Sequence, residues 1–216
     1  MYNYDYLKQK CHQKRIGIIK NLIQQYSKEG SRILSIGCGN GLIEKEFSRT
    51  VQGLDKAPIK NGLISITNGE IEKMPFPDDS FDVVFAGELL EHIYDIKQAI
   101  NEVKRVLVND GIVIFTVPNA MNFRDRVRGL FGILPRQLSG YLDENPHLYE
   151  HIRHFNKRSL KELLEGNGFE CLEFSSPAIN INIFGKTAID LYRPAKYIPS
   201  LGNNIVCVAR LSKAGK

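Results

Sequence analysis

Apolar side chains recur every three or four residues in several stretches of the chain. The longest stretch is 12–27, where this spacing predicts an amphipathic helix. The same spacing predicts helices over 95–108 and 159–164, and Gly168 is expected to end the last of them. A shorter helix is expected over 42–47, directly after a cluster of glycines.

Short runs that are almost entirely apolar lie between these helices. They cover residues 32–36, 51–54, 81–86 and 112–117. Strands without a polar face are typical of a parallel sheet that helices cover on both sides. Two later runs, 170–175 and 204–211, are predicted to close the sheet, so the pattern indicates an α/β domain.

Residues 122–150 interrupt this alternation. Several apolar side chains share a helical spacing here, with Arg124, Arg126 and Arg128 between them. A cap packed over a binding site would show this pattern, and so would a helix that lies on an anionic membrane. The apolar residues are Phe123, Val127, Leu130, Phe131 and Leu134.

The composition is that of one globular domain. Of 216 residues, 43% are hydrophobic and 25% are charged, which excludes a disordered, collagenous or coiled-coil chain. The four cysteines form no Cys-x-x-Cys pair, so neither a zinc site nor a disulfide framework is expected. No apolar run approaches the ~20 residues of a membrane-spanning helix, and the first residues lack the apolar segment of a secretory signal. We therefore expect a soluble, cytoplasmic protein.

Three glycines and an acid point to a ligand. Gly37, Gly39 and Gly41 follow a predicted strand, at the place where open α/β sheets bind ligands, and glycine lets the backbone approach a ligand closely. The dinucleotide pattern Gly-x-Gly-x-x-Gly would need a glycine where the chain has Leu42, which weighs against NAD. Asp55 ends the next strand, where a carboxylate can accept hydrogen bonds from ribose hydroxyls. Together these residues favour a nucleoside-containing ligand.

These residues resemble the class I S-adenosylmethionine-dependent methyltransferases, in the small-molecule subgroup called type 11. The resemblance covers about 31–119 and resumes at 151–169. Residues 69–82 resemble the family segment gDaeeLPFpdesFD, residues 88–92 resemble evlEHv, and Arg105 begins a segment similar to RvLkpGG. The resemblance implies a Rossmann-like, doubly wound, mostly parallel sheet of seven strands, with helices on both faces, an antiparallel last strand and an inserted cap.

The resemblance also implies S-adenosylmethionine as the cofactor. In the family, the glycine turn faces the methionine half, the acid at Asp55 binds the ribose, and the residue at Lys56 lies beside the adenine. The positions of Glu70 and Ile71 hold the adenine ring, and the backbone after the third strand meets the cofactor's amino group. The cofactor-binding residues implied in this way are Ser35, Gly37, Cys38, Gly39, Gly41, Asp55, Lys56, Glu70, Ile71, Ala86, Gly87 and Leu89.

One position departs from the family pattern. The family usually carries an acid two residues before the first glycine, and here that residue is Ser35. Serine can hydrogen-bond to the glycine turn but supplies no charge, so we expect weaker cofactor binding. A non-catalytic, S-adenosylmethionine-binding regulatory protein is therefore an alternative, and an NAD-dependent oxidoreductase is a weaker one.

Three histidines are candidate bases, since methyl transfer needs the acceptor to be positioned and, where necessary, deprotonated. His92 follows the third strand, although packing at the start of a helix explains it equally well. His151 and His154 lie in a segment similar to the family's EHxRhF. Together with His147 they would share one face of a helix and suggest a metal, but the irregular composition argues against a helix. Glu91 is more typical of a solvated or capping acid, and no metal is predicted.

The sequence predicts an enzyme that methylates a small-molecule or lipid-like acceptor, most simply at oxygen. The formal charge is +5, yet residues 33–121 carry 13 acidic and 8 basic side chains, so the basic excess lies outside the cofactor region. We therefore expect an anionic acceptor, or an anionic membrane contacted through 122–134. Nucleic acid is not expected, because Gly87-Glu88-Leu89 stands where amino-methylating enzymes tend to carry Asn/Asp-Pro-Pro-aromatic.

The chain is expected to form one domain with four parts. Residues 1–30 would form a helical lid, and 31–121 the cofactor-binding core. Residues 122–157 would form the inserted cap, and 158–216 a substrate-side helix with the closing strands.

Overall fold

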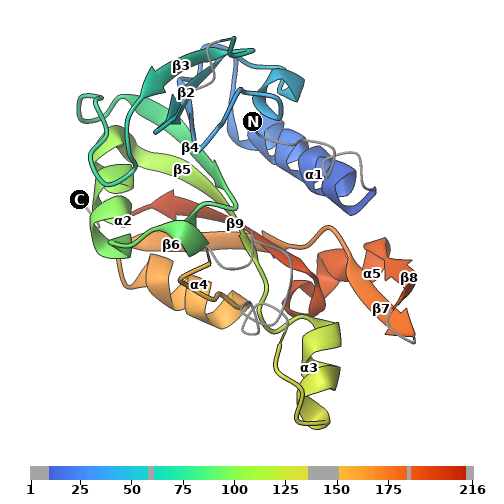
Figure 1. Cartoon of the computed structure of the whole chain (residues 1–216). Coiled ribbons are helices and arrows are strands. Elements are labelled where there is room, and N and C mark those ends of the chain that lie inside the picture. The colour runs from blue at the N-terminus through green and yellow to red at the C-terminus, as the bar shows by residue number, and fades with distance from the viewer. Residues whose placement is uncertain (1–9, 58–60, 136–150, 184–185, 213–216) are drawn as a thin grey trace.

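Seven strands form one sheet in the order β3-β2-β1-β4-β5-β9-β6 (Figure 1). The computed structural model describes residues 10–57, 61–135, 151–183 and 186–212. All neighbouring strands are parallel except β9, which runs antiparallel to both β5 and β6. The predicted doubly wound, mostly parallel sheet with an antiparallel last strand is thus confirmed. Its strands are β1 (Ile33–Ile36), β2 (Val51–Asp55), β3 (Ser65–Asn68), β4 (Phe81–Gly87), β5 (Leu107–Pro118), β6 (Phe169–Ser175) and β9 (Asn204–Leu211).

The strand order reverses at the centre of the sheet. From β1 the chain moves outward to β2 and β3, then returns to add β4 on the other side of β1. The carboxyl ends of β1 and β4 therefore lie side by side, with Ile36 paired to Ala86. In an open α/β sheet this reversal leaves a crevice in which ligands bind.

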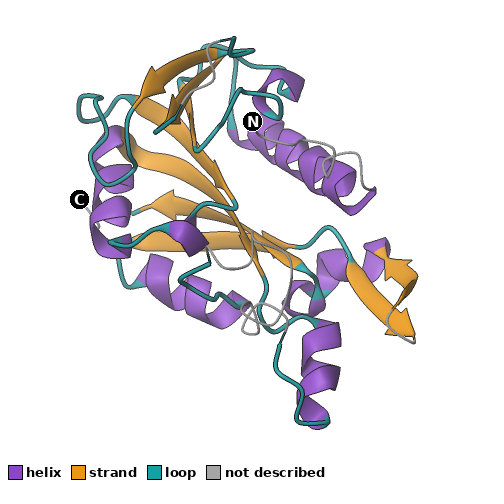
Figure 2. Ribbon diagram, in the orientation of Figure 1, coloured by secondary structure: helices purple, strands orange, loops and turns teal. Residues whose placement is uncertain are grey.

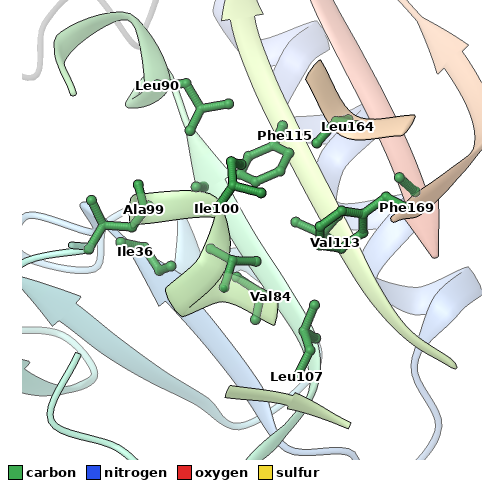
Figure 3. Close-up of a cluster of buried hydrophobic side chains, with 14 of the residues drawn as sticks. Ile36, Val84, Leu90, Ala99, Ile100, Leu107, Val113, Phe115, Leu164 and Phe169 are labelled. Carbon is green, nitrogen blue, oxygen red and sulfur yellow. The ribbon is translucent and has the colours of Figure 1, made fainter. Parts of the chain in front are cut away.

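Helices cover both faces of the sheet (Figure 2). On one face, Ile19, Leu22 and Ile23 of α1 (Lys10–Tyr26) pack against inward side chains such as Phe85. On the other face, α2 (Ile96–Val106) and α4 (Lys157–Glu165) cover the larger core cluster, which Figure 3 shows around Phe115. The helices predicted over 12–27, 95–108 and 159–164 are confirmed.

The helix predicted over 42–47 is wrong. The structure has only one short 3-10 turn there, η2 (Glu44–Glu46), because the chain becomes extended at Phe47 (φ −75°, ψ 134°) to bury that ring and enter β2. The edge strand β3 was also missed, since its residues Ser65–Asn68 are only partly covered and show no apolar run. The remaining elements are η3 (Leu90–His92), the hairpin β7 (Ile179–Ile183) and β8 (Lys186–Leu191), α5 (Tyr192–Tyr197) and η7 (Pro199–Leu201).

The inserted segment begins with α3 (Phe123–Leu130), which projects away from the sheet (Figure 1). Its apolar residues are not buried: Leu130 is 84% exposed, and Phe131 is 77% exposed. Leu134 is exposed as well. Among the described helices, none is long and apolar enough to cross a bilayer.

Candidate cofactor and acceptor site

The glycine turn after β1 adopts backbone angles that favour glycine. Gly37, Gly39 and Gly41 have φ of +70°, +53° and +80°, a region that costs other residues free energy. A Cβ on Gly41 would also lie 2.6 Å from Cγ1 of Ile64. The N–H of Gly37 donates to the carbonyl of Leu54 at 2.8 Å, which fixes the turn against β2. The turn therefore presents bare backbone at the carboxyl edge of the sheet.

Asp55 ends β2 beside this turn, as predicted. Its Oδ2 accepts the N–H of Gly39 at 2.8 Å, and its Oδ1 accepts the N–H of Ala57 at 2.9 Å. The carboxylate thus orients the turn, a role that sequence reasoning missed. Each oxygen retains a lone pair for a further donor, so the predicted ribose contact stays chemically available.

The residues predicted to hold the adenine lie along the same edge. The N–H of Gly69 donates to the carbonyl of Asp55 at 3.1 Å, which brings Glu70 next to the end of β2. Glu70 and Lys56 are exposed, whereas Ile71 is buried in the core. Their contacts with a cofactor stay predictions.

A pocket opens between the glycine turn and the end of β4. Of the predicted residues, Gly37, Cys38 and Gly87 line it, while Ala86 is fully buried beside it. Leu89 lies over the turn, 3.1 Å from where a Cβ on Gly37 would be. Burial raises the pKa of the Cys38 thiol to about 12, so this group stays protonated and is no nucleophile. The lining residues are Arg15, Ile19, Ile36, Gly37, Cys38, Ile43, Glu44, Phe85, Gly87 and Thr116.

Glu44 supplies a carboxyl group that sequence reasoning missed. The hydroxyl of Ser35 donates to Glu44 Oε1 at 2.6 Å, and both side chains are buried. Glu44 Oε2 has no hydrogen-bond partner among the described residues. Burial raises the pKa of Glu44, because a charge without a partner is costly in a poorly solvated site. The family pattern has an acid at the position of Ser35, which this chain lacks, and Glu44 supplies one to the pocket instead. A cationic ligand group would be its natural partner.

Glu88 joins α1, β5 and β9 at the end of β4. Its backbone has φ +52°, a strained value for a glutamate. Its carboxylate lies 2.9 Å from Arg15 of α1 and accepts hydrogen bonds from Thr116 of β5 (2.9 Å) and Asn204 of β9 (2.7 Å). Arg15 is buried although its helix was predicted as a lid. The network fixes α1 against the carboxyl ends of the strands.

The structure brings two of the three predicted histidines together. The rings of His92 and His151 meet edge to face with centroids 4.8 Å apart. The backbone N–H groups of Ile152 and Arg153 both donate to the carbonyl of Glu91, which docks this segment on η3. His154 is exposed and lies outside this group, so its role as a base stays a prediction.

His147, His151 and His154 were considered as a metal site on one face of a helix, and no such helix carries His151 and His154. Residues 151–154 are not helical, and His147 lies outside the described residues. Instead, Glu91, His92 and His151 each place one potential ligand atom within 4.8 Å of the others. Glu91 is also not the solvated acid that its position in the sequence suggested, because it is 1% exposed.

Comparison with known proteins identifies methyltransferases as relatives of this chain. A family model described as a methyltransferase domain matches residues 12–173. The chain is 30% identical over 154 residues to a probable S-adenosylmethionine-dependent methyltransferase of Mycolicibacterium smegmatis, a match that covers 65% of this chain and 52% of that protein. It is 29% identical over 175 residues to the ubiquinone/menaquinone biosynthesis C-methyltransferase of Stutzerimonas stutzeri, with 68% of each chain covered.

The fold is shared with solved structures. A SAM-dependent methyltransferase from Archaeoglobus fulgidus superposes with a TM-score of 0.62 at 19% identity, covering 96% of this chain and 100% of that one. The chain spans about half the length of several curated relatives that it matches.

Proposed function

The chain belongs to the methyltransferase domain family, of the class I S-adenosylmethionine-dependent kind, and on that premise we propose that it transfers a methyl group from S-adenosylmethionine to an oxygen of a small-molecule or lipid-like acceptor. The observation that carries this proposal is the pocket at the ends of β1 and β4. The glycine turn lines it, and it holds a carboxyl oxygen of Glu44 that accepts no hydrogen bond from the described residues.

We assign the two halves of the cofactor to the two sides of Asp55. The nucleoside would lie toward β2 and β3, with the ribose on Asp55 and the adenine near Glu70, Ile71 and Lys56. The methionine half would lie along the glycine turn, toward Ala86, Gly87 and Leu89. Its cationic end would face Glu44, which restores the charge that Ser35 lacks. This assignment follows from the family pattern together with the carboxyl groups described above.

The chemistry places few demands on the protein. Methyl transfer is an in-line displacement in which the acceptor oxygen forms a bond to the methyl carbon as the bond from carbon to sulfur breaks. The electron pair of that bond stays on sulfur and neutralises its charge. An alcohol acceptor must also lose its proton. The groups we assign to that proton are His92, whose backbone N–H donates to the carbonyl of Leu89, and His151, whose ring contacts that of His92.

A lipid-like acceptor is supported by the apolar end of α3. Leu130, Phe131 and Leu134 are exposed together there, and the side chain of Arg128 donates to the carbonyl of Leu134 at 3.2 Å, which fixes the turn. Exposed apolar clusters of this kind mark sites that meet a membrane or an apolar ligand. The relative of Stutzerimonas stutzeri is named as a C-methyltransferase of ubiquinone and menaquinone biosynthesis, so precursors from quinone biosynthesis belong among the acceptors to be tested.

The test is turnover on a panel of acceptors. The protein would be incubated with S-adenosylmethionine and with hydroxylated quinone precursors, free phenols and polar alcohols, and S-adenosylhomocysteine would be quantified by mass spectrometry. We expect product with the apolar hydroxylated acceptors. Cofactor binding without turnover on any of them would contradict the proposal and favour the non-catalytic alternative.

A further inference from the structure

Three groups that commonly bind metal ions converge at η3, which follows β4. One carboxylate oxygen of Glu91 and one ring nitrogen each of His92 and His151 all lie within 4.8 Å of one another. Bonds of about 2 Å from one ion in tetrahedral coordination would place its ligands ~3.3 Å apart. The most widely separated of these ligand atoms therefore need to approach each other by at most about 1.5 Å to share an ion.

The carboxylate of Glu91 lacks a partner in the described part of the chain. Glu91 is 1% exposed, and neither of its carboxylate oxygens has a hydrogen-bond partner there. Glu88, three residues earlier, has an arginine, a threonine and an asparagine on its carboxylate. Burying a carboxylate without a partner is costly, and a bound cation removes that cost.

The backbone holds the second part of this group in place. Ile152 and Arg153 donate to the carbonyl of Glu91 at 3.0 and 3.1 Å, and Nε of Arg153 donates to the carbonyl of Ile93 at 2.9 Å. His151 is thus positioned by the same residue whose carboxylate faces it. Two imidazoles and one carboxylate, pre-organised in this way, suit a divalent transition metal and leave coordination positions open.

We propose that Glu91, His92 and His151 bind one divalent transition-metal cation whose open position takes the acceptor hydroxyl. The reaction role rests on the proposed function. A cation lowers the pKa of a bound hydroxyl, so the acceptor releases its proton to water and attacks the methyl carbon as an alkoxide. The C–S bond breaks with its electrons left on sulfur. In this arrangement His92 and His151 hold the ion and do not accept the proton themselves, so their proposed role as bases is replaced by that of ligands.

The test is a titration of the full, tag-free chain with Co²⁺ after treatment with a chelator, followed by calorimetry and by the visible absorption of Co²⁺. We expect one ion per chain. Glu91→Gln and His151→Gln should each weaken binding at least about tenfold, since even indirect ligand supports are worth that much. His154→Gln is the matched control, because it is a histidine of the same segment outside the group, and it should bind as the unmodified chain does.

Two results would overturn the site: no binding by the unmodified chain at millimolar Co²⁺, or equal affinities in His151→Gln and His154→Gln. Circular dichroism and the affinity for S-adenosylhomocysteine show whether each variant is folded, and two ligand variants guard against the failure of one. If the unmodified chain does not bind S-adenosylhomocysteine, the proposed function is contradicted. If it binds S-adenosylhomocysteine but not Co²⁺, only the metal site is contradicted.

Discussion

At the scale of single residues, the pocket depends on groups that come from different parts of the chain. Gly37 and Asp55 were predictable, since each follows an apolar strand. Glu44 and Glu91 were not, because nothing in the local pattern shows that their carboxyl groups turn inward and remain buried. Ser35 illustrates the difference: its lack of charge is evident in the sequence, but the glutamate that accepts its hydrogen bond is visible only in three dimensions.

Replacing Glu44 with glutamine tests the role of this carboxyl group. Glutamine keeps an acceptor for Ser35 but removes the charge, so we expect Glu44→Gln to weaken S-adenosylmethionine binding about tenfold or more, the value of a charge-assisted hydrogen bond. Isothermal titration calorimetry measures the affinity. Glu46→Gln is the matched control, because Glu46 is exposed two residues away. Equal affinities in the two variants would refute the assignment.

The glycine turn makes a second prediction at this scale. Gly41→Ala should lower the free energy of unfolding by about 1–3 kcal/mol, because alanine at φ +80° is strained and its Cβ would meet Ile64. Gly17→Ala, in the middle of α1 with nothing within 4 Å, should instead stabilise the chain by about 0.5–1 kcal/mol. Urea unfolding at neutral pH measures both. A Gly41→Ala variant as stable as the unmodified chain would contradict the conformation described for the turn.

At the scale of elements, long amphipathic helices and apolar strands were predictable because their repeats extend over many residues. The short elements were not predictable. The three residues of η2 and the half-covered edge strand β3 contain too few apolar positions to form a recognisable pattern in the sequence. Arg105 begins one of the segments that resemble the family, and the structure shows what its side chain does. Arg105 binds both oxygens of Glu102 and the carbonyls of Met74 and Phe76, which fastens α2 to the loop before β4.

This contact predicts an acid-sensitive contribution to stability. The hydrogen bond from Arg105 holds the pKa of Glu102 below its ordinary value of 4.5. Its stabilisation is therefore present above that pH and is lost as the pH falls through the folded pKa. We expect Glu102→Gln to cost about 1–2 kcal/mol at pH near 7 and almost nothing at strongly acidic pH.

Urea unfolding at the two pH values checks this prediction. Asp78→Asn is the control, because Asp78 pairs with the same arginine at 2.8 Å but is 71% exposed, and it should change the unfolding free energy by less than about 0.5 kcal/mol. If Glu102→Gln lowers the free energy of unfolding by the same amount at both pH values, the charge of Glu102 is not the cause of the loss.

At the scale of the whole molecule, the alternation of strands and helices was enough to predict the layered fold, and the family resemblance supplied the strand count and the direction of β9. The division into four parts stays a prediction. Residues 33–121, which include the glycine turn, carry 13 acidic and 8 basic side chains, so the basic excess comes from other segments of the chain. Arg15 of α1 nevertheless lines the pocket beside the turn. The apolar end of α3 is exposed, and the helix projects away from the sheet (Figure 1).

The end of α3 should therefore govern membrane contact. We expect the chain to sediment with anionic vesicles more than with neutral ones, and Phe131→Asp to reduce that fraction about tenfold, the value of burying one large apolar side chain. Leu63→Asp is the control, since Leu63 is 48% exposed before β3, away from α3. Equal sedimentation of the two variants would contradict the prediction that the end of α3 contacts a membrane.

The most direct test of the central claim is calorimetric titration of the unmodified chain with S-adenosylmethionine, S-adenosylhomocysteine and NAD. We predict binding of the first two with one site per chain and no binding of NAD, because the turn holds Leu42 where a dinucleotide site needs glycine. Binding of NAD, or no binding of S-adenosylhomocysteine, would contradict the proposal that this pocket holds the methyl donor.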